Sequence, residues 1–523
     1  MRKIIAKYGA DNCTSPLVQG TYSTGFNLLD FETMSAIGDS WLPKDLFQRL
    51  LSHDLSIKFT VDEKNHVTNL LIDIMPNKQF PFIDIDYHPH RVLAASLIIK
   101  HIPKGLKDGG SSIYSGFSGL GKTTATLQTA GNIFQNLKDY KTKEGAYMTK
   151  IHYYITEKNA IDKSRFRELT RMTDEEYANG VEVGGAADNS TDDFVSYILN
   201  IRNEKLDNQM NLVTDVMCVD GKVRKTLAPT IVVCDSLSAM RVGKYADKME
   251  KEFEKGKDGN KESDIMRALQ AKATMLSTTN LFKYCEEANI IILFIVHIGQ
   301  DQGISIGYQN VQIKTGLNDK TAHKTKGVPA NIKYLMDGIF DLSGMDADMA
   351  GLNDLYGRPD NDLRFVARML IGKNRGGEVY KGKSIPMVFT SAGQFDNSIS
   401  TFYYYHKELG KFDYSTARID GIYKEYAQGG MPSEGSELLK FTKGKVTDTM
   451  IFNSPISNMI IANNLFRDIY LEKMYKSEAV EARQAVNNLL TGSSDGLLDM
   501  FKNFNLSMPI MEIDEDIQVK EVA

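Results

Sequence analysis

The sequence contains a glycine-rich run, Gly116-Phe117-Ser118-Gly119-Leu120-Gly121-Lys122-Thr123-Thr124. From Gly116 to Thr123 it fills every position of the pattern G-x-x-x-x-G-K-[ST], in which glycines let the backbone wrap a phosphate and turn its N–H groups inward. An apolar segment, Ser112–Tyr114, precedes the run, and an amphipathic segment over Thr123–Leu137 follows it. Because the pattern requires a strand, a tight loop and a helix N-terminus, we predict a phosphate-binding loop rather than a chance glycine-rich turn.

Three side chains would complete a nucleotide site around this loop. Lys122 would reach the β- and γ-phosphates of ATP, and the hydroxyl of Thr123 would bind Mg²⁺. Asp235 ends the apolar run Ile231–Cys234 and fits the acidic position that holds a Mg²⁺-bound water. On its own, Asp235 would more simply cap a turn, but the glycine-rich run upstream favours the metal role. We therefore expect ATP and Mg²⁺ as cofactors.

Hydrolysis of ATP also needs a group that orients or activates water. Glu157 lies just beyond the strand-like run Ile151–Ile155, where a carboxylate could face the γ-phosphate. From its placement alone, Glu157 could equally be a solvated loop residue.

Apolar runs of strand length alternate with amphipathic segments from about residue 96 to 410, which is typical of a parallel sheet covered by helices on both faces. We predict an α/β fold with an N-terminal region 1–95, a core 96–410 and a helical C-terminal region 411–523 that ends in an acidic tail. In the first region, alternation in Ser56–Val61 and His66–Ile72 favours a β-hairpin, although the turn lacks glycine. The expected core strands are Ser112–Tyr114, Ile151–Ile155, Thr230–Cys234, Ile290–Val296, Gly338–Leu342 and Arg364–Ile371.

Composition limits the classes of partner and compartment. The chain has 523 residues, with 62 Lys and Arg against 67 Asp and Glu, so any contact with DNA should be local. Its four cysteines form no C-x-x-C pair, which argues against a zinc site or a disulfide framework. The longest apolar run, Ile290–Val296, is far shorter than the roughly 20 residues of a membrane helix. With no secretory signal visible, we expect a cytoplasmic protein without a membrane partner.

Together these residues resemble the RecA-fold strand-exchange proteins, most closely the UvsX-type recombinases of large bacteriophages. Ser23–Asp30 looks like the S-T-G-x-x-x-L-D motif of RecA proteins, and Val233–Leu237 resembles their V-x-D-S motif. Ser263–Ala268, followed by Lys272, is spaced like the segment before the next core strand in UvsX-type proteins. The likeness extends from the glycine-rich run to Gly410, and more weakly to both ends. It implies a RecA-like P-loop ATPase core.

The resemblance also implies catalytic roles. Glu157 takes the position of the general base, and His297 takes the strand-end position that senses the γ-phosphate. Val296 departs from the family's polar residue there, and a lone strand-end His is more often structural. Lys373 and Arg375 resemble the K-x-K or K-x-R element that reaches into the nucleotide of a neighbouring subunit. Because alternate residues of a strand point to the same side, both cations could address one phosphate group.

The family places DNA-binding loops after two core strands, here Arg241–Lys261 and Gly299–Ala330. In the second loop, Tyr308, Ile304 and Ile306 could stack on bases or wedge between them, and four lysines could contact phosphates. These lysines are Lys314, Lys320, Lys324 and Lys326. The first loop interleaves its lysines with acidic residues, so a solvated helix is an alternative there. A plain flexible loop is the alternative for the second.

The resemblance therefore implies a DNA-dependent ATPase that forms helical filaments on single-stranded DNA and exchanges strands with double-stranded DNA in recombination, repair and replication. Single-strand-binding and mediator proteins would be further partners, in an infected bacterial cell if a bacteriophage encodes the chain. A DnaB-type hexameric helicase is the alternative, because Gly372–Gly377 also resembles that family's K-N-R-x-G element. The Asp235-Ser236 pair and Ser23–Asp30 weigh against the helicase. A third class, an accessory protein that uses ATP only for assembly, is disfavoured by the retention of Glu157.

Overall fold

The computed structural model describes most of the chain between residues 2 and 404. The described residues are 2–15, 18–33, 42–51, 56–74, 84–86, 91, 94–95, 97–98, 101–156, 161–185, 190–240, 280–298, 330–355, 361–375, 384–397, 400 and 403–404. The expected helical region 411–523 lies outside them. So do the loop 241–261 and, apart from Ala330, the loop that begins at Gly299.

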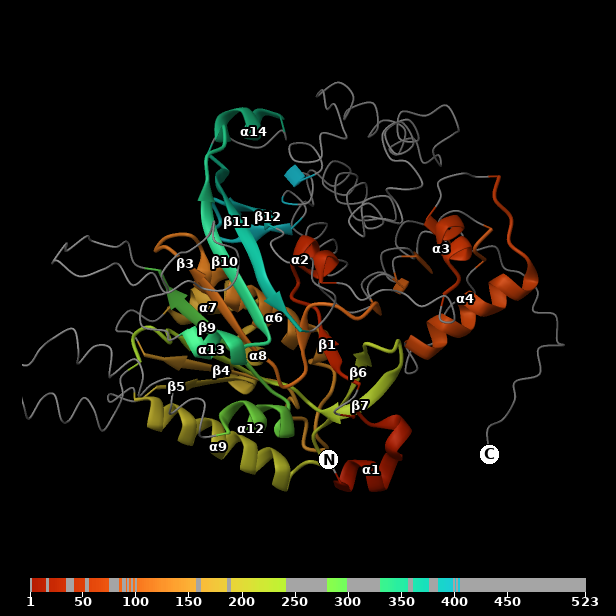
Figure 1. Ribbon diagram of the computed structural model, residues 1–523, viewed down its shortest axis with the longest axis horizontal. Helices are drawn as coiled ribbons and strands as arrows, with labels where there is room; N and C mark the ends of the chain where they lie inside the picture. The colour runs from red at the N-terminus through yellow and green to blue at the C-terminus, as the bar shows by residue number, and fades with distance from the viewer. Residues whose placement is uncertain are drawn as a thin grey trace, which may run out of the picture.

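A nine-stranded mixed sheet forms the centre of the described chain, in the order β13-β12-β11-β10-β3-β9-β8-β4-β5 (Figure 1). From β10 to β5 the neighbours run parallel, and β11 to β13 continue the sheet antiparallel. The parallel strands are β10 (Gly338–Met345), β3 (Ser111–Gly116), β9 (Ile290–His297), β8 (Thr230–Asp235), β4 (Lys150–Ile155) and β5 (Val181–Gly184). The antiparallel ones are β11 (Leu363–Asn374), β12 (Ser384–Thr390) and β13 (Phe395–Asp396). The predicted α/β class and each predicted core strand are confirmed.

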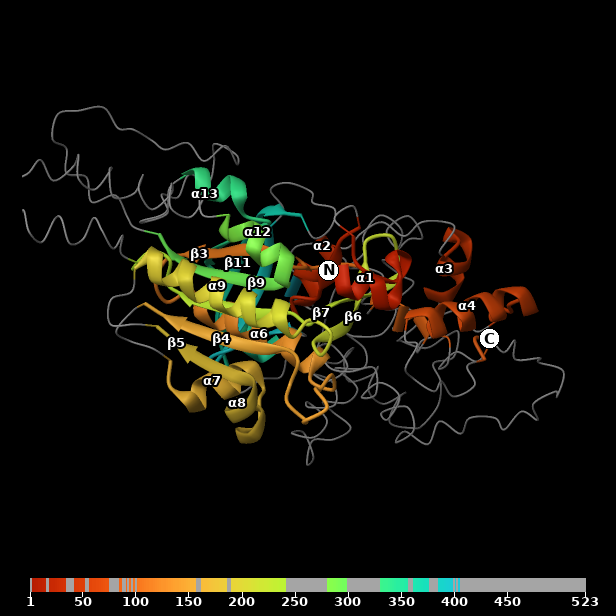
Figure 2. The ribbon, with the colours of Figure 1, turned by 90° about the horizontal axis from the view of Figure 1, so that it is seen from below.

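Two cores lie on opposite faces of this sheet, because successive side chains of a strand point to opposite sides. Tyr153 faces one core, together with α6 (Lys122–Leu137), α7 (Lys163–Thr170) and residues next to α8 (Asp174–Gly180). Tyr154 faces the other, with α9 (Thr191–Asp207), α12 (Leu281–Ala288) and α13 (Ala330–Leu335). Figures 1 and 2 show α9 and α12 together on one side of the sheet. The parallel strands are therefore covered on both faces, as their continuous apolar sequences require.

A second, four-stranded sheet has the order β2-β1-β6-β7 and packs beside the core. Its strands are β2 (Leu106–Lys107), β1 (Gly20–Tyr22), β6 (Val213–Cys218) and β7 (Val223–Leu227). Ile4 of α1 (Arg2–Tyr8) packs with Cys13, just after η1 (Ala10–Asn12), and with Leu227. The other described helices are α2 (Asn27–Glu32), α3 (Lys44–Leu51), α4 (Val61–Ile74) and α14 (Met349–Leu355). All four cysteines are buried free thiols.

The β-hairpin predicted around Ser56–Ile72 is wrong, because α4 begins at Val61 and covers the expected turn and second strand, and residues 56–60 form no strand. The N–H of Thr60 donates to Glu63 Oε2 at 2.8 Å, and the N–H of Glu63 donates to Thr60 Oγ1 at 3.3 Å. This reciprocal pair is a capping box, which starts a helix. The buried residues then recur with helical spacing. They are Val67, Leu70, Leu71 and Ile74.

Candidate functional site

The glycine-rich run connects the C-terminal end of β3 to the N-terminus of α6. Gly121 precedes the helix with φ 80°, a left-handed conformation that favours glycine. A Cβ atom at Gly121 would lie 2.8 Å from the ring of Phe395, and one at Gly116 would lie 2.6 Å from the carbonyl oxygen of Leu342. A side chain at Gly116 would therefore collide with Leu342, and one at Gly121 would collide with Phe395.

Lys122 and Thr123 point toward groups that a phosphate site would use. Lys122 is buried, and its Nζ donates to the carbonyl oxygen of Phe117 at 2.8 Å, which holds the ammonium within the loop. Thr123 Oγ1 lies 3.4 Å from Asp235 Oδ2, a weak hydrogen bond. The hydroxyl of Tyr153 donates to the same Asp235 oxygen at 2.9 Å. The structure thus brings Lys122, Thr123 and Asp235 to one end of the sheet, as predicted.

The pair of Thr123 and Asp235 fits the ligand preference of Mg²⁺, because both offer hard oxygen atoms that lie close together. Among the described residues, no group of three or more His, Cys, Asp and Glu is placed to hold a metal ion. A Mg²⁺ ion between Thr123 and Asp235 would therefore take its remaining ligands from water and from a bound phosphate, as is usual in nucleotide sites.

The ends of β4 and β8 are joined next to Asp235. Thr156 N donates to the Asp235 carbonyl at 2.8 Å, and Ser236 N donates to Thr156 Oγ1 at 2.6 Å. The Asp235–Ser236 peptide bond is cis. Glu157 follows Thr156 in the chain and lies outside the described residues, so its role as general base stays a prediction.

His297 ends β9, where the parallel register places it opposite Gly116. Its backbone N–H donates to Ser238 Oγ at 2.9 Å, which ties the end of β9 to the turn after β8. This placement beside the start of the glycine-rich run agrees with the predicted sensor position. The sensing role itself stays a prediction.

Lys373 and Arg375 do not lie at this end of the sheet. Lys373 is paired in register with Ile339, which is paired with Ile113, three residues before Gly116. At about 3.3 Å per residue, Lys373 is roughly 10 Å along the strands from the loop, and Arg375 continues away from it. Partial burial, followed by the charge of Arg375, lowers the pKa of Lys373.

Both cations are held by the segment around α13. Lys373 Nζ donates to the Tyr334 carbonyl at 2.8 Å, and Arg375 Nη1 lies 3.6 Å from Asp337 Oδ1. Within one chain both cations therefore lie toward the opposite end of β3 and β10 from the glycine-rich run.

Sequence reasoning missed two contacts at the loop. Tyr153, whose hydroxyl orients Asp235, lies in a predicted strand. Because successive strand residues point to opposite faces of the sheet, the sequence indicated that Tyr153 and Tyr154 face opposite sides. Ser115, directly before Gly116, donates its hydroxyl to Asp341 on β10. The sequence could not predict this contact, because the contact depends on β3 and β10 being neighbours in the sheet.

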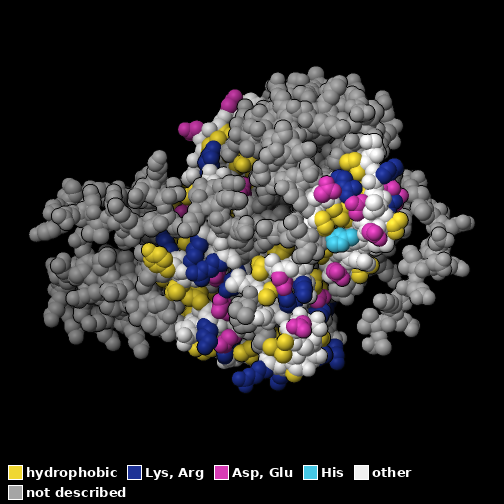
Figure 3. Space-filling model, turned by 45° about the vertical axis from the view of Figure 1, so that its right-hand side comes forward, with side chains coloured by type: hydrophobic (Ala, Val, Ile, Leu, Met, Phe, Trp, Pro, Cys, Tyr) yellow, Lys and Arg dark blue, Asp and Glu magenta, His cyan; other side chains and the backbone are white. Residues whose placement is uncertain are grey.

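The residues predicted to contact DNA belong to the part of the chain that the structure does not describe. Tyr308, Lys314, Lys320, Lys324 and Lys326 lie outside the described residues, as does Ser263–Ala268. On the face in Figure 3, basic and acidic side chains are interspersed over the described surface.

No protein-family model matches the chain, and a search of curated proteins finds no match. None of the helices that the structure describes is long and apolar enough to cross a membrane.

Proposed function

We propose that the chain is an ATP-dependent DNA recombinase, a RecA-like P-loop ATPase that assembles on single-stranded DNA and exchanges strands with double-stranded DNA. The observation that carries the ATPase part is the meeting of Lys122, Thr123 and Asp235 at the loop between β3 and α6. The N–H groups at a helix N-terminus attract phosphate, and a lysine and a paired acidic residue complete such a site. The DNA part rests on the sequence resemblance.

The residues of this site divide the work of hydrolysis. Lys122 and the loop N–H groups would hold the phosphates, and Thr123 and Asp235 would hold Mg²⁺, which neutralises negative charge on the phosphates when bound. Tyr153 fixes the Asp235 oxygen that faces Thr123. Glu157 would orient the attacking water. Replacing Glu157 by Gln should therefore leave ATP binding intact and abolish DNA-stimulated hydrolysis, whereas wild-type turnover would place the base elsewhere.

The position of Lys373 and Arg375 supports a site shared between subunits. They lie at the other end of the strands from their own loop, close to the exposed side chains of Tyr334 and Leu335. An exposed patch that combines hydrophobic and basic side chains suits contact with a second copy of the chain. From there both cations could stabilise the charge that develops on a neighbour's nucleotide, so that turnover would depend on assembly.

Electron microscopy with single-stranded DNA and a slowly hydrolysed ATP analogue tests the proposal. We expect helical filaments that need both ligands, and none from a Lys122→Ala variant on its own, because none of its interfaces would hold nucleotide. Closed rings without filaments would instead support the hexameric helicase, whose K-N-R-x-G element Gly372–Gly377 also resembles. Strand exchange between homologous DNAs, with unwinding of a forked duplex as the comparison, would then separate the two activities.

A further inference from the structure

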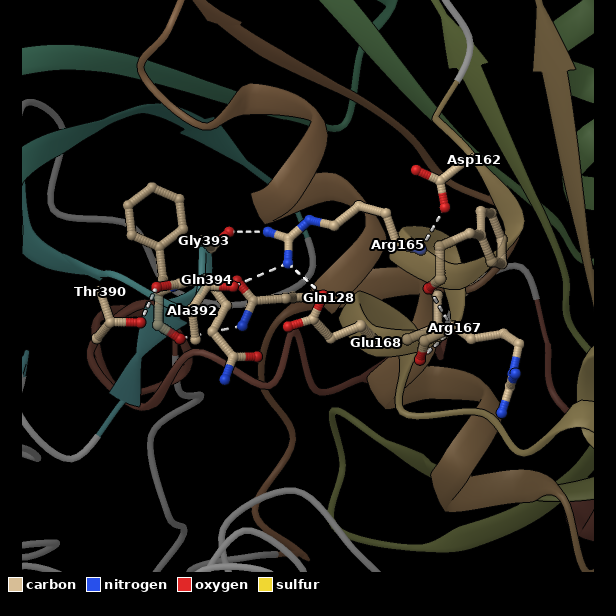
Figure 4. A network of polar contacts seen from close by, with 12 residues as sticks. Gln128, Asp162, Arg165, Arg167, Glu168, Thr390, Ala392, Gly393 and Gln394 are labelled. Atoms are coloured by element: carbon tan, nitrogen blue, oxygen red, sulfur yellow. Dashed lines mark hydrogen bonds and ion pairs between the residues drawn. The ribbon is translucent and has the colours of Figure 1, made fainter. Parts of the chain in front are cut away.

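The β12–β13 hairpin, residues 384–396, is attached to the helix that follows the glycine-rich run. Gln128 on α6 donates from Nε2 to the Phe395 carbonyl at 3.0 Å, and Phe395 N donates back to Gln128 Oε1 at 3.1 Å. Figure 4 shows the Gln128 side chain between α6 and the hairpin. One amide side chain thus satisfies both backbone groups of a strand residue, which fixes the hairpin against the helix in register as well as in distance.

The ring of Phe395 connects the hairpin to the glycine-rich run, because it packs against Gly121. Phe395 is buried, and its ring lies where a Cβ atom at Gly121 would come within 2.8 Å of it. Phe389 packs edge to face on it with ring centroids 5.1 Å apart, and Phe26 does so at 6.2 Å. Because aromatic rings packed in this way have little freedom to move, Phe395 forms a rigid stop against the last glycine before α6.

Arg165 on α7 holds the turn of the same hairpin. Its guanidinium donates to the carbonyl oxygens of Ala392, at 2.9 Å, and Gly393. Glu168 pairs with the same guanidinium at 2.6 Å. Figure 4 shows Arg165 reaching across to the turn, whereas Arg167 on the same helix points away from it. The hairpin is therefore fixed at its turn by α7 and at Phe395 by α6.

We propose that the β12–β13 hairpin is a clamp that keeps the glycine-rich run in a phosphate-binding conformation, with Gln128 and Arg165 as positioning residues. The physical reason is preorganisation: N–H groups bind an anion best when their direction is fixed before the anion arrives. Gln128 sets the position of Phe395, and Phe395 limits the movement of Gly121. This inference rests on the proposed function, because it concerns the loop that would bind ATP.

Two variants of the full chain test the α6 contact. Gln128→Ala removes both hydrogen bonds to Phe395. Gln135→Ala is the matched control, because Gln135 lies on the same helix and donates to the Arg171 carbonyl at 2.9 Å, away from the loop. We expect the dissociation constant of the fluorescent nucleotide mant-ATP with Mg²⁺ to rise roughly five- to tenfold in Gln128→Ala only. Because the loop would bind phosphate equally before and during reaction, KM should rise while kcat stays nearly constant.

Arg165→Ala, with Arg167→Ala as its control, tests the turn. Arg167 pairs with Asp174 at 2.7 Å and has no contact with the hairpin among the described residues. Arg165→Ala should weaken mant-ATP binding in the same direction as Gln128→Ala. Since both residues act through one hairpin, the double variant should lose less affinity than the two single effects combined. Full additivity would mean that the residues do not share the clamp.

Hydrogen–deuterium exchange of the nucleotide-free chain separates this inference from the proposed function. Gln128→Ala should speed exchange of the amides in 117–123, and Gln135→Ala should not. If the wild-type chain binds no mant-ATP, the proposed function fails, and the exchange result alone decides whether the hairpin holds the loop. If Gln128→Ala changes neither exchange nor affinity beyond its control, the clamp is overturned while nucleotide binding stands.

Discussion

At the scale of single residues, Tyr153 has the sharpest consequence for the site. Its hydroxyl donates to the Asp235 oxygen that faces Thr123. Tyr153→Phe removes one hydrogen bond to a carboxylate, worth about 1.5–3 kcal/mol, so we expect ATP turnover to fall by roughly 10- to 150-fold. Tyr154→Phe is the control, because Tyr154 lies on the opposite face and its hydroxyl has no partner among the described residues. Steady-state ATPase measurements would show equal losses in both variants if the contact with Asp235 were unimportant.

A second residue-scale prediction concerns Lys205, which burial brings to a pKa of about 7. Its Nζ donates to the Ala228 carbonyl at 2.6 Å, to Thr230 Oγ1 at 2.9 Å and to the Asn289 carbonyl at 3.0 Å. In an unfolded chain the pKa of lysine is about 10.4. Between these values the unfolded chain binds a proton that the folded chain lacks, so stability should rise with pH.

Lys205→Met removes this titration and isolates it from the other groups. We expect the urea midpoint of the wild type, relative to that of Lys205→Met, to increase from pH 7 to pH 9, with a slope of the unfolding free energy no greater than about 1.4 kcal/mol per pH unit. A midpoint difference that is constant over this range would show that Lys205 stays charged in the folded chain.

The residues of the candidate site were partly predictable because each one ends an apolar strand or begins a helix. Lys122, Thr123 and Asp235 could be expected at one end of a parallel sheet, since the carboxyl ends of parallel strands share an edge. Tyr153 and Asp341 could not be assigned partners. Their contacts depend on β4 lying next to β8 and β10 next to β3, and the sequences of these strands do not specify their neighbours.

At the scale of elements, α4 shows where strand and helix signals compete. Period-two alternation in Ser56–Val61 favoured a strand, but the Thr60–Glu63 pair and the spacing of Val67, Leu70 and Leu71 satisfy a helix better. A capping box satisfies two free N–H groups, whereas the proposed hairpin turn lacked a residue suited to positive φ. The four-stranded sheet was not predicted for another reason. Its strands are short, and strands that pair, such as β1 and β6, lie far apart in the sequence, so no local pattern indicates the pairing.

The capping box makes a testable contribution to α4. Thr60→Ala removes the side chain that accepts from Glu63 N, and loss of such a cap costs about 1 kcal/mol. We expect faster hydrogen exchange in the first turns of α4. Thr68→Ala, at an exposed position of the same helix, should leave exchange unchanged or slow it, because alanine favours helix. Equal exchange in Thr60→Ala and the wild type would mean that packing alone fixes the helix start.

At the scale of the whole molecule, the sheet separates two groups that the proposed ATPase site would need together. The glycine-rich run follows one end of β3, and Lys373 and Arg375 lie toward the other end of the neighbouring strands. A rigid sheet cannot bend to unite them within one chain. If both groups serve the same nucleotide, the chain must present its loop to one neighbour and its cations to the other, which is a head-to-tail interface. Such an interface builds a ring where the rotation between subunits closes and a helical filament where it does not.

Mixing two inactive variants tests this arrangement. Lys122→Ala should lose nucleotide binding, and a Lys373→Ala, Arg375→Ala double variant should bind nucleotide without turning it over. When the two are mixed in equal amounts, random assembly places an intact loop against intact cations in roughly one interface in four, so about a quarter of wild-type turnover should return on single-stranded DNA. Each variant mixed with itself gives the baseline. Recovery requires that the two groups lie on different subunits of one site, so a mixture no more active than its components would place Lys373 and Arg375 outside the nucleotide's reach.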